Sequence, residues 1–173
     1  MIDAAGQPSR KRQRQARTTG RLAAVQALYQ LDVTDMGLEE VVDDFLRHRL
    51  QETVDEVAYQ SADREHFETV VRGVTTELAD IDDMLSAVLS GDWTIERLEP
   101  LLRAVMRAAT FELADMRDIP ARVAIAEYMA VAHAFFAERE PAMVNGVLDS
   151  IGHALRHEEM DERSASSPAD RER

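Results

Sequence analysis

Residues 67–88, FETVVRGVTTELADIDDMLSAV, decide the fold class, because apolar side chains recur there at alternating steps of four and three. This spacing puts the apolar side chains on one side of an α-helix, where they can pack against other helices. The set comprises Phe67, Val71, Val74, Leu78, Ile81, Leu85 and Val88. We predict one long helix over these residues, in which Gly73 marks either a close approach of a neighbour or a weak point.

The same helical spacing recurs along the rest of the chain, and no useful stretch alternates apolar and polar residues as a strand does. The seven glycines and five prolines are too few to interrupt most of the chain. Besides the long helix, we expect helices over residues 18–32, 38–50, 94–116, 121–137 and 141–155. The sequence therefore predicts a compact all-α bundle.

Local signals mark the ends of several of these helices. Thr94 is a suitable N-cap, and Pro120 suits the first turn of the following helix. Residues 121–137 are so apolar that we expect this helix to be buried on most sides. Gly146 lies within the last periodic segment, and we interpret it as a place where a neighbouring helix approaches rather than as a hairpin turn.

Charge is distributed unevenly along the chain. The net charge is −13, from 20 basic and 33 acidic residues. The first 21 residues, however, hold six basic residues against Asp3 alone, a net charge of +5, which leaves −18 on the remainder. The acidic total would argue against a nucleic-acid binder, but it hides a cationic N-terminal segment.

Several classes of chemistry have no motif in this sequence. The chain has no cysteine, no glycine-rich phosphate loop and no His-Glu-x-x-His or Glu-x-x-His pair. Asp80, Asp82 and Asp83 point to different sides of a helix, and His133 suits a hydrogen-bonded core or interface position. The longest apolar stretches are far too short to span a bilayer. We therefore expect a cytoplasmic protein that is not an enzyme and that has no cofactor, no metal and no membrane segment.

The one polarised feature is a basic cluster in the sequence RKRQRQAR, residues 10–17, which Arg21 extends. Guanidinium groups match phosphate oxygens, and a disordered basic arm that folds on RNA is a known mode of recognition. We expect residues 1–16 to form such a flexible arm and residues 157–173 a disordered tail. A solubilising tail or an organelle address are the alternatives for the basic cluster. The RNA-binding candidates here are Arg10, Lys11, Arg12, Arg14, Arg17 and Arg21.

Four segments, in this order, resemble the NusB transcription antitermination family. They are AAVQALY at residues 23–29, VMRAATFEL at residues 105–113, DIP with VAIAE at residues 118–127, and VNGVLD at residues 144–149. The resemblance implies an all-helical fold of about seven helices in two small subdomains, over residues 17–156. Ala126 and Phe136 depart from the family's usual asparagine and glycine.

The resemblance also implies a function. Members of this family pair with NusE, a ribosomal small-subunit protein, and bind the boxA RNA of ribosomal RNA leaders within the RNA polymerase antitermination complex. By position, Arg17, Arg21 and Arg107 match family arginines and are RNA-binding candidates. The candidates for partner binding are Tyr29, Phe135 and Met143, of which Met143 is not aromatic here.

Other interpretations stay open at this point. The chain could be a helical scaffold or a homodimer that uses Phe135, Phe136 and Met143 as a self-interface. A NusB-like RNA-binding domain also begins a ribosomal RNA cytosine methyltransferase, although this chain has no room for a catalytic domain before Arg173. For Tyr29 the alternative is core packing, and for Arg107 it is an intramolecular salt bridge.

Overall fold

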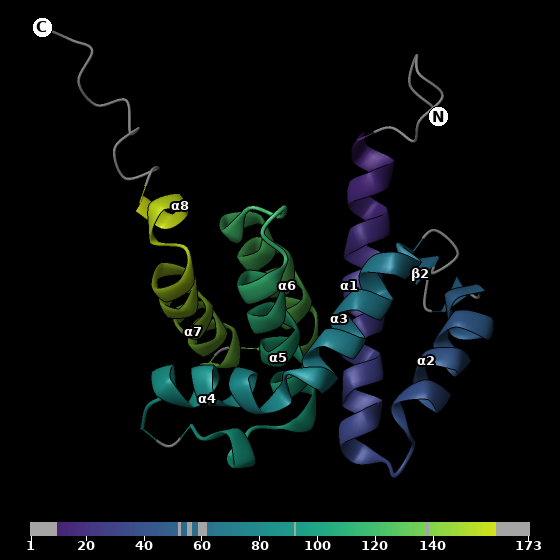
Figure 1. Cartoon of the computed structure of the whole chain (residues 1–173), viewed down its shortest axis with the longest axis horizontal. Coiled ribbons are helices and arrows are strands. Elements are labelled where there is room, and N and C mark those ends of the chain that lie inside the picture. The colour runs from purple at the N-terminus through teal and green to yellow at the C-terminus, as the bar shows by residue number, and fades with distance from the viewer. Residues whose placement is uncertain are drawn as a thin grey trace, which may run out of the picture.

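The computed structural model describes residues 10–51, 53–54, 57–58, 62–91, 93–137 and 139–161. In these ranges the chain forms eight α-helices and a two-residue antiparallel pair of strands, β1 (Thr53–Val54) and β2 (Val57–Ala58) (Figure 1). The helices are α1 (Arg10–Val33), α2 (Leu38–Arg47), α3 (Arg64–Thr76), α4 (Leu78–Val88), α5 (Pro100–Asp115), α6 (Ala121–Phe135), α7 (Arg139–Leu155) and α8 (His157–Asp161). Short 3-10 turns are η1 (Arg49–Gln51) and η3 (Ile95–Arg97). The predicted all-α class is confirmed, with eight helices in the described ranges where about seven were expected.

Helix α5 is the centre of the bundle and packs against α1, α3, α4, α6 and α7. Small alanines let these neighbours approach, and Val105, Met106 and Leu113 fill the space between them. Helices α1, α2 and α3 lie together on one side of the molecule, and α4, α6, α7 and α8 lie on the other (Figure 1). These two groups of helices are joined through α5.

The predicted helix over residues 67–88 is two helices, because α3 ends at Thr76 and α4 begins at Leu78. Glu77, with φ −105° and ψ 20°, joins them. Thr75 and Thr76 donate their hydroxyl hydrogen bonds to carbonyls four residues back, which favours a bend. The apolar spacing continues across the break because both helices pack against α5, but Leu78, just after the break, is 37% exposed and not buried as expected.

Glycine positions test two of the expectations. At Gly73 an added Cβ would lie 2.0 Å from the ring of Phe111, so the close approach is confirmed. At Gly146 an added Cβ would meet nothing within 4 Å, so the expected helix approach there is wrong. Gly146 simply faces outward on α7.

Helix starts also differ from the expectations. Thr94 begins only the η3 turn, and its side chain makes no capping hydrogen bond. Helix α5 begins at Pro100, which holds Glu99 in an extended conformation and needs no N–H partner. Helix α7 begins two residues before Pro141, at Arg139. Helix α6 is exposed along one side, including at His133, so its expected burial on most sides is wrong.

Parts of both terminal segments that were expected to be flexible or disordered are helical. Residues 10–16 of the predicted flexible arm form the first turns of α1, and residues 1–9 lie outside the described part. Residues 157–161 of the predicted tail form α8, because Met160 is buried against Gly152. Residues 162–173 lie outside the described part. Among the described helices, none combines the length and the apolar character needed to cross a membrane.

Candidate nucleic-acid interface

The N-terminal turns of α1 carry five of the predicted cations on the surface. Arg10, Lys11, Arg12 and Arg14 are exposed and Arg17 is half-buried; we call these five residues the basic strip. This end of α1 extends past the helices beside it (Figure 1). Its polar sequence explains the extension, because the first buried residue of α1 is Thr19. The basic strip is therefore held on a helix whose later turns, from Thr19 onward, are anchored in the core.

A groove of about 230 Å³ runs beside the basic strip. Helix α1 contributes one wall, and the turn before α6 with the start of α6 contributes the other. The lining residues are Arg10, Gln13, Arg14, Arg17, Arg21, Ile119, Pro120, Val123 and Glu127. Cationic side chains on one wall, opposite apolar side chains on the other, form a surface that can bind a phosphate and contact the sugar or base attached to it.

Acidic residues already contact two members of the basic strip. Arg14 donates from Nε to Glu127 Oε1 at 3.1 Å, and its Nη2 lies 3.1 Å from the same oxygen. Arg17 lies 3.7 Å from an Asp63 oxygen and 3.8 Å from one of Asp118. Arg10, Lys11 and Arg12 have no ion-pair partner among the described residues. Their charges are the ones most available to an anion.

The position of Arg17 depends on a close approach of two chain segments. The Asp63 backbone N–H donates to the Ala16 carbonyl at 2.9 Å, and an added Cβ at Gly20 would lie 2.8 Å from the Asp63 carbonyl. The Asp63 side chain also accepts a hydrogen bond from the His66 N–H at the start of α3. Gly20 thus lets the start of α3 lie against α1, beside the guanidinium of Arg17.

Arg21 is buried, which corrects its prediction as an RNA contact. Its side chain is 3% exposed. Its Nε donates to both oxygens of Glu112 at 3.1 and 3.0 Å, and its Nη2 donates to Oε1 at 2.5 Å. Burial works against the charged form, but the hydrogen bonds and charge of Glu112 outweigh it and raise the pKa of Arg21. Arg21 lines the base of the groove as a structural residue.

Glu112 is the centre of a buried polar cluster that the sequence analysis missed. Besides Arg21, it contacts His66 Nε2 at 3.1 Å and accepts a hydrogen bond from the Tyr128 hydroxyl at 3.1 Å. Burial alone would raise its pKa, yet the hydrogen bonds from His66 and Arg21 lower the pKa of Glu112 to about 2. The cluster joins α1, α3, α5 and α6. Its only sequence signal is an acid in the apolar segment VMRAATFEL.

Arg107 lies at the other end of α1 from the basic strip. It donates to Asp82 from Nε at 2.8 Å and from Nη2 at 2.7 Å, and its Nη1 lies 3.4 Å from Asp32. Residues 14 and 32 are separated by roughly 27 Å along the axis of α1, at 1.5 Å per residue. The intramolecular salt bridge, which was the alternative for Arg107, is confirmed. Arg107 is not part of the candidate interface.

The three predicted partner-binding residues lie on three helices. Tyr29 on α1 is 40% exposed, so its alternative of core packing is wrong. It follows Leu28, which lines a hollow of about 300 Å³ where α1, α3 and α5 meet; most of its lining is apolar, with Asp32 and Arg107 beside it. Phe135 at the end of α6 is 45% exposed, and Met143 on α7 is half-buried against the core. Phe135 and Met143 therefore lie at the joined ends of α6 and α7, and Tyr29 lies near the end of α1.

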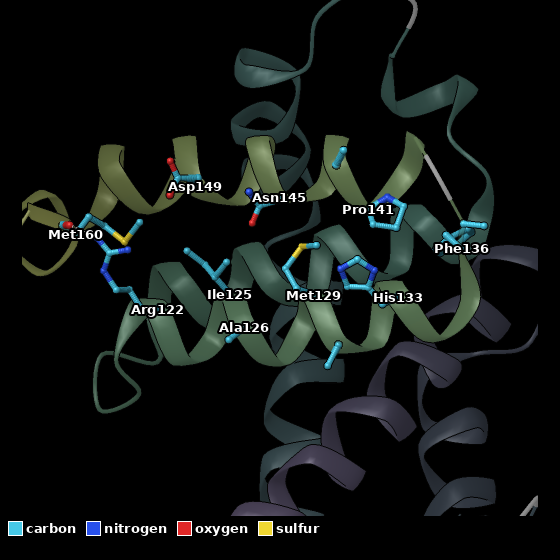
Figure 2. Close-up of a pocket in the computed structure, with 13 residues that line it drawn as sticks. Arg122, Ile125, Ala126, Met129, His133, Phe136, Pro141, Asn145, Asp149 and Met160 are labelled. Carbon is cyan, nitrogen blue, oxygen red and sulfur yellow. Dashed lines mark hydrogen bonds between the residues drawn. The ribbon is translucent and has the colours of Figure 1, made fainter. Parts of the chain in front are cut away.

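A second groove, of about 830 Å³, lies between α6 and α7 on the other side of α6 from the basic strip (Figure 2). Ile125 and Met129 point into it from α6, and Pro141 and Asn145 face them from α7 (Figure 2). His133, predicted as a core or interface histidine, lines this groove and is exposed. The groove is mostly apolar, with Arg122 and Asp149 toward its α8 end. It holds one cation, so the basic strip remains the candidate for RNA.

Comparisons of this chain with known proteins all indicate the same family. The model of the NusB family matches residues 18–153. The transcription antitermination protein NusB of Rhizobium rhizogenes is 44% identical over 142 residues, which cover 82% of this chain and 89% of that protein. The protein of the same name from Agrobacterium fabrum is 44% identical over 152 residues, covering 88% and 92%.

A solved structure of T. maritima NusB supports the fold. It is 30% identical in sequence and superposes with a TM-score of 0.68. The match covers 83% of this chain and 96% of the T. maritima chain. Because the relatives are named as transcription antitermination proteins, the prediction that the chain is not an enzyme is confirmed on the same ground. Both the sequence segments and the helical arrangement agree, and the chain belongs to the NusB family.

Proposed function

We propose that this chain pairs with NusE and binds the boxA RNA of ribosomal RNA leaders, as the RNA-binding subunit of the cytoplasmic RNA polymerase antitermination complex. One observation supports this proposal most directly. The exposed cations Arg10, Lys11, Arg12 and Arg14 gather on one end of α1, beside a groove, in a protein whose remaining sequence is strongly acidic. Such a surface binds phosphates at one edge only.

The proposed mechanism is equilibrium binding, with no covalent step. Arg10, Arg14 and Arg17 follow one another at steps of four and three, so they lie on one side of α1 and face the groove. We propose that they contact consecutive phosphates, with Lys11 and Arg12 adding charge beside them. The acidic remainder repels the rest of the transcript and keeps it at this edge.

The salt dependence of binding tests this function. We expect the logarithm of boxA affinity, in the presence of NusE, to fall with the logarithm of salt at a slope of about −3.5, from five single-strand phosphate contacts. The combined change Arg10→Gln, Lys11→Gln and Arg12→Gln should weaken binding by about ten- to a hundredfold at 0.1 M salt and reduce the slope to about −1.5. Fluorescence titration of labelled boxA measures both.

The matched control removes the same charge elsewhere. Arg47→Gln, Arg49→Gln and Arg72→Gln change three arginines on α2, η1 and α3, and these should leave RNA affinity within about twofold. Equal loss in both triple variants would contradict a localised interface, and a scrambled RNA of equal length tests sequence preference.

For the NusE contact we propose the end of α1 around Tyr29. Its exposed ring, the exposed Leu78 and the adjacent, mostly apolar hollow form an amphipathic surface of the kind that protein partners cover. Tyr29→Ala should weaken co-purification with NusE without changing the melting temperature by more than a few degrees. Phe135→Ala is the comparison, because the exposed Phe135 favours the homodimer alternative. If light scattering shows a tight dimer that Phe135→Ala breaks, that alternative holds.

A further inference from the structure

One carboxylate lies between the basic strip and the core. Glu127 is buried, although it lines the groove on the side opposite Arg14. Its Oε1 accepts from Arg14, its Oε2 accepts a hydrogen bond of 2.5 Å from the Thr18 hydroxyl, and Arg21 Nη1 lies 3.6 Å from the same oxygen. Glu127 therefore connects an exposed arginine of α1 with a buried one.

Among the described buried residues, no cation is available to balance the charge of Glu127 alone. Arg21 is shared between two carboxylates, but its short hydrogen bonds all go to Glu112. Glu112 also has His66 and Tyr128 as hydrogen-bond partners, whereas Glu127 has the neutral Thr18 and the surface cation Arg14. Arg14 thus serves as the second counter-charge of a buried carboxylate. This distinguishes it from Arg10, Lys11 and Arg12.

Resting on the function proposed above, we propose that Glu127 restrains the basic strip: it holds Arg14 along the groove and offsets its charge, so RNA binds more weakly than five free cations would allow. Arg14 is 78% exposed; its Nε–H donates to Glu127 and its Nη2 lies 3.1 Å from the same oxygen, so its outer N–H groups remain open to a phosphate. An incoming phosphate must share Arg14 with a carboxylate about 3 Å away. A strand that places several phosphates along the strip at once overcomes this restraint better than a single phosphate does.

The variant Glu127→Gln tests the restraint with little change in shape. Glutamine retains an oxygen that can accept from Thr18 or Arg14, and Arg21 keeps its bonds to Glu112. With NusE present, we expect Glu127→Gln to bind boxA RNA about two- to fivefold more tightly than the wild type, the range that corresponds to one partly exposed ion pair. The salt slope should become steeper by up to about 0.7.

Two controls separate the restraint from other effects. Glu40→Gln removes one negative charge from the exposed side of α2 and should leave affinity unchanged, which accounts for net charge. In an Arg14→Gln background, adding Glu127→Gln should change affinity by less than about 1.5-fold, because the restrained cation is gone. The ¹⁵N relaxation of Arg14 Nε gives a readout without RNA, and it should show faster motion in Glu127→Gln than in the wild type.

A stability measurement and a second variant guard against a folding defect. If Glu127→Gln melts much earlier than the wild type, Glu127→Asp keeps a carboxylate beside Arg21 but shortens its reach to Arg14, and should give a smaller gain in affinity. Equal or weaker RNA binding by folded variants at position 127 would overturn the restraint while leaving the proposed function intact. Absence of RNA binding by the wild type, or no effect of the Arg10, Lys11 and Arg12 changes, would overturn both.

Discussion

The two halves of α1 hold their charges in different ways. Arg14, Arg17 and Arg21 share one side of the helix, yet their side chains are 78%, 36% and 3% exposed in turn. The exposure falls because α1 passes from the surface into the bundle. Near the other end of α1, Asp32 forms ion pairs with Arg103 and Arg107 at the rim of the bundle, where the charged groups stay partly hydrated. Depth along the helix axis, more than helix face, decides which arginine can meet a ligand.

The largest expected effect breaks the buried cluster. Arg21→Met leaves Glu112 buried without its cation, and we expect the free energy of unfolding to fall by about 3–5 kcal/mol. Urea denaturation followed by circular dichroism measures the change. A loss below about 1 kcal/mol would mean that His66 and Tyr128 suffice to hold the Glu112 charge.

Acid should remove part of the same stabilisation. The pKa of Glu112 is lowered to about 2 in the folded protein, against an ordinary value of 4.5, so its ionised form favours folding. That contribution is fully present above about pH 4.5 and is lost as pH falls toward 2. Unfolding free energies measured between pH 5 and 3 should fall for the wild type and fall less for Glu112→Gln, whose side chain does not titrate. Parallel curves would show that other carboxylates dominate acid unfolding.

The smallest effect belongs to the pair at the far end of α1. Arg107→Met leaves Asp82 and Asp32 partly hydrated, and Arg103 still pairs with Asp32. We expect the free energy of unfolding to fall by about 1 kcal/mol, and boxA affinity to stay within twofold of the wild type. Denaturation and RNA titration of one preparation measure both. A large loss of boxA affinity with an intact fold would show that Arg107 belongs to the RNA interface. It would also contradict the proposed difference between the two ends of α1.

Much of the fold was predictable because helical periodicity needs only local order. The spacing from Phe67 to Val88 gave the correct class, although it could not reveal the break at Glu77, since two successive helices that pack against the same neighbour, α5, keep a single pattern. Gly73 and Gly146 look alike in sequence, but only Gly73 faces an aromatic ring. Packing partners far along the chain decide that difference.

The sequence by itself determined the all-α class, the family segments and the concentration of cations at residues 10–21. These depend on residue type and spacing, which act locally. Only the tertiary structure decided that Arg21 is buried against Glu112, that Arg107 pairs with Asp82 and Asp32 at the rim of the bundle, and that Arg14 faces Glu127 across the groove. Ion pairs such as Arg21–Glu112 join residues 91 positions apart, and no local pattern encodes them, because burial and charge partners arise only when helices pack.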